Sequence, residues 1–176
     1  MGEILPPLPV KLICPVLCAS VHSPDKIISL LEESFGRVDY ISECIPFHYT
    51  DYYTREMGEN LLRFFTSFET LIGPEKIADI KITTNCLEET LKTTANSGRS
   101  VNIDPGYIEA SKVVLASTKN FSHRIYLKKG IYAEVTLIYT RKSFQDLPWT
   151  FPDYRTSFYK EQLHKIRSIY MQQLRV

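Results

Sequence analysis

The stretch HRIYLKKGIYAEVTL (residues 123–137) decides the fold class, because apolar and polar residues alternate in it on both sides of a central glycine. A period of two is typical of a β-strand, and a glycine between two such runs is typical of a hairpin turn. Polar residues that suit a pocket, among them Asp104 and the pair His123-Arg124, lie in or near this hairpin in the chain. Residues 98–139 therefore predict a sheet that carries a polar pocket.

The hairpin allows two registers. A two-residue loop at Lys129-Gly130 would place Ile125 opposite Glu134 and mix polar with apolar side chains on both faces. A type I turn one residue earlier, with Gly130 left-handed as a bulge, places Arg124 opposite Glu134 and separates the two kinds of side chain. We predict this second register. Its apolar face consists of Ile125, Leu127, Ile131, Ala133, Val135 and Leu137.

The same patterns predict the other elements outward from the hairpin. Apolar runs rich in β-branched and aromatic residues predict strands over residues 10–19, 37–47, 64–72, 101–104 and 112–117. Helices are predicted after Ser23-Pro24, after Gly73-Pro74 and at the C-terminus, each with an apolar stripe at helical spacing.

The order β-α-β-β-α-β, then a hairpin and a helix, predicts an α+β fold of one domain over residues 1–176. We expect a mixed, largely antiparallel sheet covered by helices, with a ferredoxin-like core order to which the hairpin and the C-terminal helix are added. Pro15 removes an amide donor, so the first strand should lie at an edge or bend there. Asp104-Pro105-Gly106-Tyr107 predicts a turn between two short strands.

Composition excludes several classes of protein. The net charge of +1 gives no electrostatic footprint for nucleic acid or for an anionic membrane. No run approaches the roughly 20 apolar residues that span a bilayer, and the proline-rich N-terminus does not resemble a signal peptide. The four cysteines form no C-x-x-C pair and no disulfide framework. We therefore expect a soluble cytoplasmic protein with inert thiols and no membrane association.

Five residues near the hairpin are the main candidates for a site. Arg124 could hold a phosphate or carboxylate, with Glu134 orienting its guanidinium, and Lys119 follows a strand where an ammonium could meet the same anion. Asp104 or His123 could handle a proton or a cation. Each also has a structural interpretation: a cross-strand ion pair, a solvated loop, a turn aspartate and a core histidine.

Two polar-aromatic segments could supply the rim of the pocket. Asp51 and Tyr53 come from the first, and Tyr154 comes from the proline- and aromatic-rich loop before the last helix. We expect Asp51, Tyr53 or Tyr154 at the rim of a concavity lined by Asp104, Lys119, Arg124 and Glu134. No histidine or cysteine spacing predicts a metal site, no nucleophile lies in a recognised motif, and no cofactor follows from the sequence.

Long motifs resemble those of a bacterial domain-of-unknown-function family, number 4416, whose members are sometimes labelled GTP-binding. They are TDYYxxEMG (50–58), FExLIxP (68–74), IKxxTNxLE (80–88), VNIDPGY (101–107), HRIYLxxGIYAEVTL (123–137) and PWTFPDY (148–154). The resemblance covers nearly the whole chain and implies a single-domain bacterial protein, but it transfers no catalytic residue. The sequence contains no Walker-type loop and no N-K-x-D motif that would correspond to the GTP label.

Two hypotheses of different classes follow. The first is a protein that binds a small anionic ligand, with nucleotides and phosphorylated metabolites as candidates, in a polar pocket on the sheet. The second is an RNA- or protein-binding module that uses the tyrosine- and tryptophan-rich surface without catalysis, although the near-neutral charge argues against nucleic acid.

Overall fold

The computed structural model describes residues 2–92 and 98–175, and it shows an α+β fold built on one ten-stranded sheet. The sheet order is β10-β9-β7-β6-β1-β4-β2, and β3, β5 and β8 pair with β4, β1 and β9. The strands are β1 Lys11–Ala19, β2 Val38–Ile41, β3 Ile45–Pro46, β4 Leu61–Phe68, β5 Val101–Ile103, β6 Gly106–Ile108, β7 Lys112–Ser117, β8 Ile125–Lys128, β9 Ile131–Thr140 and β10 Ser143–Asp146. The α-helices are α1 Pro24–Phe35, α2 Thr54–Met57, α3 Ile77–Thr90 and α4 Ser157–Gln173.

The first half of the chain has the predicted ferredoxin-like order. Strands β6, β1, β4 and β2 are neighbours in that order, so the strands joined by α1 are separated by β4. We expected a mixed, largely antiparallel sheet, and every ladder between described strands is antiparallel. Strand β1 is central, so the expectation that Pro15 marks an edge is wrong.

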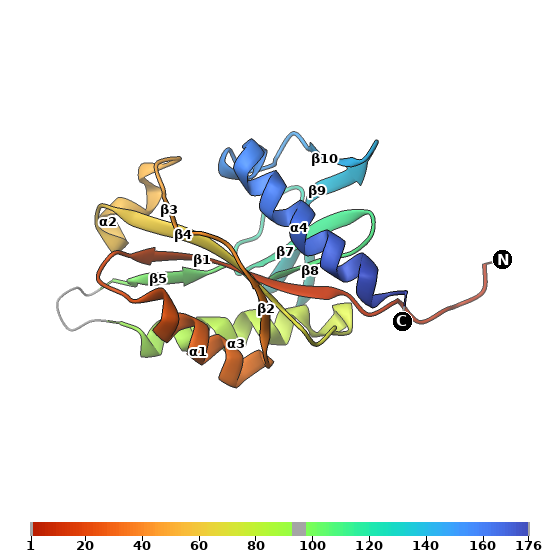
Figure 1. Cartoon of the computed structure of the whole chain (residues 1–176), viewed down its shortest axis with the longest axis horizontal. Coiled ribbons are helices and arrows are strands. Elements are labelled where there is room, and N and C mark those ends of the chain that lie inside the picture. Colours follow the sequence, from red (N-terminus) through yellow and green to blue (C-terminus); the bar gives the residue numbers. More distant parts are fainter. Residues whose placement is uncertain (1, 93–97, 176) are drawn as a thin grey trace.

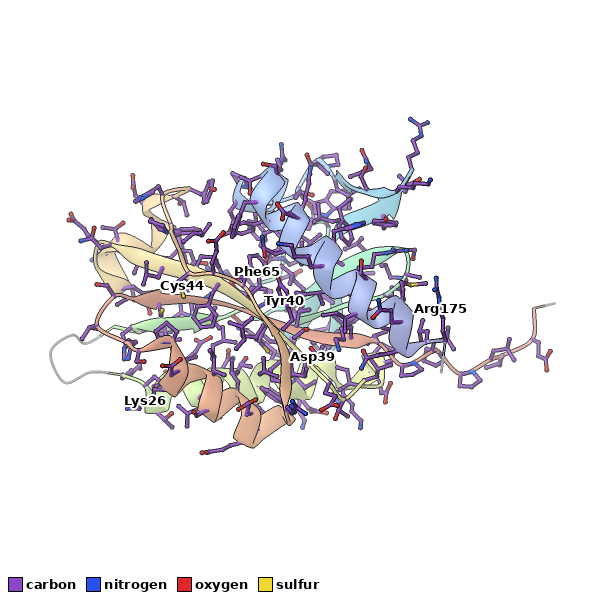
Figure 2. The ribbon with its side chains drawn as sticks, viewed as in Figure 1. Lys26, Asp39, Tyr40, Cys44, Phe65 and Arg175 are labelled. Atoms are coloured by element: carbon purple, nitrogen blue, oxygen red, sulfur yellow. The ribbon has the colours of Figure 1, made fainter. Side chains whose placement is uncertain are left out.

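Helices cover both faces of the sheet, with α1 and α3 on one side and α4 on the other (Figure 1). Because side chains alternate along a strand, Leu12 of β1 lies in one core cluster with Ile27 of α1 and Ile77 of α3, while Ile13 belongs to the α4 face. Phe65 of β4 lies in the middle of the molecule toward α4 (Figure 2).

The bounds of two strands differ from the sequence prediction. The strand expected over residues 37–47 is divided into β2 and β3, and the strand expected over 64–72 begins earlier and ends at Phe68. In contrast, α3 is continuous through residues 80–83, although apolar and polar residues alternate there as in a strand. Ile80 and Lys81 are both buried there, so tertiary packing decides the local structure.

The predicted turn at Asp104-Pro105 is an interruption within one strand. β5 and β6 pair with β1 in the same register, as the pairs Val16–Ile103 and Ile13–Gly106 show. The carbonyl of Pro15 accepts from the Asp104 amide, and the carbonyl of Pro105 accepts from Ala116. Neither proline can donate in return, so the ladders on both sides of Asp104-Pro105 are weakened.

The sheet separates beyond this interruption. β5 continues alongside β1, whereas β7 continues alongside β9 to Ser117, and no ladder joins β5 to β7 in the part of the chain that the structure describes. Contacts from α3 reach both strands from below. The separation therefore leaves room on the sheet for side chains from several elements.

The β8–β9 hairpin has the predicted register. Ile125 pairs with Ala133, which places Arg124 opposite Glu134 as expected. The turn itself is different: Lys129 and Gly130 form a two-residue loop with φ of 51° and 77°. Positive φ at both positions suits the twist of a hairpin, and a bulge near Leu127 restores the register.

A second bulge changes which side chains of β9 point to each face of the sheet. Thr136 is the extra residue between the pairs Val113–Leu137 and Val114–Val135. Leu137 therefore turns to the α4 face, where it is fully buried, and its predicted grouping with Val135 is wrong. The bulge also exposes backbone carbonyls that hold a later loop, as described below.

None of the helices in residues 2–92 and 98–175 combines the length and apolar character needed to cross a bilayer.

The Gly130→Val variant tests the hairpin turn. A Cβ at Gly130 would meet nothing within 4 Å, so the cost is conformational, and we expect a loss of stability. A β-branched residue in left-handed geometry should lower the free energy of unfolding by at least about 1–2 kcal/mol. Denaturant unfolding measures this loss, and Lys129→Gly is the matched control that should keep or raise stability. A Gly130→Val protein as stable as the wild type would contradict the turn geometry.

Candidate functional site

A cavity of about 690 Å³ lies where the sheet separates. Its walls come from β4, β5, β7, β9 and α3, and from the segments around Tyr53 and Tyr154. The volume falls in the range of small-molecule pockets, roughly 300–1,000 Å³. The cavity therefore has the size for a metabolite.

The structure brings six of the eight candidate residues to this cavity. Asp51 and His123 do not line it. Asp51 is exposed at the start of a 3-10 turn, between the lining residues Thr50 and Tyr52. The six that line it are Tyr53, Asp104, Lys119, Arg124, Glu134 and Tyr154.

Arg124 is held along one edge of its guanidinium. Its Nε donates to Glu134 Oε2 at 2.6 Å, and its Nη1 donates to Ser117 Oγ and to the carbonyl of Lys119, both at 2.9 Å. The side chain of Glu134 is only 1% exposed, so this ion pair is shielded from solvent. In the described residues Nη2 of Arg124 has no partner, and a ligand in the cavity could accept from it.

His123 contacts Glu134 as well, although neighbouring residues of a strand would face opposite sides of the sheet. Its Nε2 lies 3.0 Å from Glu134 Oε2, and its ring stacks on Trp149 with an interplanar angle of 8°. Strand alternation does not apply because residues 121–124 precede β8 and form a turn. His123 therefore supports Glu134 from outside the cavity.

Lys119 lies at the mouth of the cavity. Its amide donates to Ser117 Oγ and closes a short turn after β7, and its Nζ contacts the hydroxyl of Tyr52. This contact joins the end of β7 to the segment before α2. The ammonium is exposed and lies in the same cavity wall as Arg124.

Arg63 of β4 is the most important residue that the sequence analysis missed. It is only 2% exposed, and it lines the cavity between two carboxylates. Its Nη1 lies 3.4 Å from Asp104 Oδ2 and its Nη2 lies 3.8 Å from Asp153 Oδ2, while its Nε has no partner within the described residues. The guanidinium carbon lies 5.3 Å from the ring centroid of Phe47. A lone charge in the apolar strand LLRFFTSF (61–68) was the available indication.

Asp153 is the second residue that the sequence analysis missed. Its side chain is 9% exposed, and it lies at the start of the 3-10 turn that leads into α4. Burial raises the pKa of its carboxyl group, an effect that Arg63 opposes and Asp104 increases. A carboxyl group of this kind in a cavity is a candidate for binding or proton exchange.

Arg99 belongs to a scaffold at the floor of the cavity. It donates to Glu56 of α2, Glu88 of α3 and Asn102 of β5 at 2.8–3.0 Å, so four of its five N–H donors are occupied. Its hydrogen bonds hold the pKa of Glu56 below the usual range, whereas burial raises that of Glu88. This group joins three elements of the chain. Because its members bind one another, we expect other residues to bind a ligand.

The aromatic loop before α4 forms one wall and is tied to the β9 bulge. Trp149 Nε1 donates to the carbonyl of Val135 at 2.8 Å, and Thr150 Oγ1 donates to that of Thr136 at 2.6 Å. Burial raises the pKa of Tyr154, so its hydroxyl stays protonated and can donate. The bulge thus positions the wall that carries Asp153.

No group of three or more metal-ligating side chains occurs among residues 2–92 and 98–175. The residues that line the cavity offer guanidinium, ammonium, carboxylate, hydroxyl and aromatic groups for recognition.

The family profile described as Domain of unknown function (DUF4416) matches residues 8–170 of the 176-residue chain. No curated protein and no solved structure matches significantly.

The Arg124→Lys variant tests the support of the guanidinium. A lysine cannot reproduce three hydrogen bonds to Glu134, Ser117 and Lys119, so we expect the free energy of unfolding to fall by about 1–3 kcal/mol. Denaturant unfolding followed by circular dichroism measures the change. Arg141→Lys, at an exposed position, is the control and should be silent. A silent Arg124→Lys would contradict the observed hydrogen bonds.

The Asp153→Asn variant tests the environment of that carboxyl group. A raised pKa means that the folded protein binds this proton more tightly than the unfolded chain, so this group's contribution to stability falls as pH rises above its ordinary pKa of 3.8. Asp153→Asn should therefore raise the melting temperature at pH 7 and have less effect at pH 4. The exposed control Asp51→Asn should change it little. A loss of stability at pH 7 would contradict this assignment.

Proposed function

The chain belongs to the family described as Domain of unknown function (DUF4416), and from the cavity of this member we propose that it binds a small anionic ligand, a phosphorylated metabolite or a nucleotide. The observation that carries the proposal is the fixed guanidinium of Arg124, which is held on one edge and has a free donor at the cavity. Lys119 supplies a second positive charge in the same wall.

Two other cations of the cavity, Lys81 and Arg99, are already engaged, and a third, Arg63, lies between two carboxylates. Lys81 donates to the carbonyl of Ile103 at 2.7 Å and lies 3.7 Å from Glu88, and Arg99 has its three acidic and amide partners. Arg124 and Lys119 are therefore the groups that an anion would meet first. Oriented guanidinium groups favour phosphate and carboxylate because they can donate along a planar edge.

Aromatic side chains complete the proposed site. Tyr53, Phe151 and Tyr154 line the cavity and offer apolar faces against which a base or an aliphatic group could lie. Burial raises the pKa of the Tyr53 hydroxyl, so this group also donates rather than repels an anion. We propose binding and assign no reaction to the site.

A binding module is the second candidate, and one observation favours it. Phe121, Ile125 and Tyr126 are 65%, 73% and 57% exposed on and before β8. Exposed apolar side chains on an edge strand are typical of surfaces that meet another protein. Nucleic acid is disfavoured by the net charge of +1.

We also propose a cytoplasmic protein that acts without a membrane, based on cysteine usage and the composition of the chain. The family resemblance further implies a bacterial protein. Cys14 and Cys18 are buried, and burial raises the pKa of both thiols, to about 11 for Cys18, which suits inert core residues.

The Lys119→Met variant tests the anion site. A thermal-shift screen with nucleotides, phosphorylated metabolites and inorganic phosphate first identifies a binding anion, and calorimetry then measures its affinity. We expect Lys119→Met to weaken that affinity about tenfold while the melting temperature without ligand stays near the wild type. Lys26→Met is the control, because Lys26 lies on the outer side of α1, away from the cavity (Figure 2).

Equal loss of affinity in both variants would indicate non-specific charge attraction. A screen in which no anion binds, together with loss of a partner protein in Tyr126→Ser, would contradict the ligand proposal and favour the module.

A further inference from the structure

Arg63 has far fewer hydrogen bonds than a buried guanidinium needs. Its five N–H donors make one long contact with Asp104 at 3.4 Å, Asp153 lies at 3.8 Å, beyond hydrogen-bond distance, and the hydroxyl of Tyr159 lies nearby. The residue is 2% exposed and lines the cavity. Buried charges normally have good partners, so these loose contacts indicate a group that enters from the cavity.

The chemistry of that group follows from the two signs of charge. A second anion would meet Arg63 but would be repelled by Asp104 and Asp153, and an ammonium would meet the carboxylates but would be repelled by Arg63. A hydroxyl can accept from a guanidinium and donate to a carboxylate at the same time. Neighbouring hydroxyls of one ligand would thus satisfy all three side chains.

The surroundings of this cluster suit a compact ring or chain of carbon atoms. Phe47, Tyr53 and Tyr154 lie in the same part of the wall, with Phe47 against the Arg63 guanidinium. Their apolar faces can pack on C–H groups, while the side-chain amide of Asn102, which has an unpartnered Nδ2 among the described residues, can donate to another oxygen.

One ligand can reach both the Arg63 cluster and the anion site. Ala116 donates to the carbonyl of Pro105, so Asp104 and Ser117 are the next residues on the two separating strands. Asp104 contacts Arg63, and Ser117 contacts Arg124. The two groups therefore lie on adjacent backbones within one cavity.

We propose that Asp104, Arg63 and Asp153 bind the hydroxyl groups of a polyol or sugar, so that the ligand of this cavity is a sugar phosphate or a similar hydroxylated phosphate ester. This rests on the proposed function, because the phosphate is the anion held by Arg124 and Lys119. Arg63, Asp104 and Asp153, here called the hydroxyl cluster, select among phosphates. Arg124 and Lys119, the anion site, supply the charge interaction.

Calorimetry with matched probes tests the proposal. The probes are inorganic phosphate, ribose 5-phosphate, glucose 6-phosphate, glycerol 3-phosphate and free ribose, each titrated into the full chain. We expect at least one of the three phosphate esters to bind ten or more times more tightly than inorganic phosphate. The proposal is overturned if none binds more tightly than inorganic phosphate.

The variants Asp153→Asn and Asp104→Asn test whether these carboxylates cause the tighter binding of phosphate esters. Each keeps the size of the side chain but removes the charge that strengthens a hydroxyl hydrogen bond. In either variant that folds, the advantage of the best ester over inorganic phosphate should fall at least fivefold, while the affinity for inorganic phosphate stays unchanged. The control Asp51→Asn, outside the cavity wall, should leave both affinities as they are. An advantage that persists in both cavity variants would overturn the assignment.

The two proposals fail in different ways. Binding of inorganic phosphate without an ester advantage contradicts the hydroxyl cluster and leaves the anion site. Binding of free ribose that depends on Asp153, without any phosphate binding, supports the cluster and contradicts the anion site. Absence of binding by every probe contradicts both.

Discussion

The interruption of the strand at Asp104-Pro105 is the constraint on which the rest of the structure depends. Pro15 of β1 lies opposite the interruption, and Pro105 lies within it next to β7. Neither residue has a backbone N–H, so the hydrogen-bonded ladder cannot be continuous there. The chain keeps its register along β1 on both sides, which preserves the core. The strands that separate there give the cavity its floor, and α3 closes it from below.

Polar side chains occupy this opening in two arrangements. Arg99 and the Oε2 atom of Glu134 lie in groups with short hydrogen bonds, and the Arg99 group joins several elements of the wall. The buried ion pairs of Arg63, in contrast, are long, at 3.4 Å to Asp104 and 3.8 Å to Asp153. Since unsatisfied buried charge lowers the stability of a protein, such an arrangement is expected where binding matters more than stability.

The sequence predicts the parts of the fold that depend on binary patterns. The register that places Arg124 opposite Glu134 follows from alternation alone, and the ferredoxin-like order follows from the order of helices and strands. Patterns did not predict that Asp104-Pro105 lies within a strand, because the residue that pairs with it, Pro15, is distant in the chain. Arg63 was missed for the same reason, since its carboxylate partners come from other elements.

The hydrogen bonds that hold the aromatic loop on β9 also fix the position of a fluorescent side chain, Trp149. Trp149 is the single tryptophan of the sequence, and it stacks on His123 at a centroid distance of 5.2 Å while its indole donates to the carbonyl of Val135. The loop that it anchors carries Asp153 into the cavity wall. Its fluorescence therefore comes from one known position beside the cavity, and the unlabelled chain contains its own optical reporter of changes in that wall.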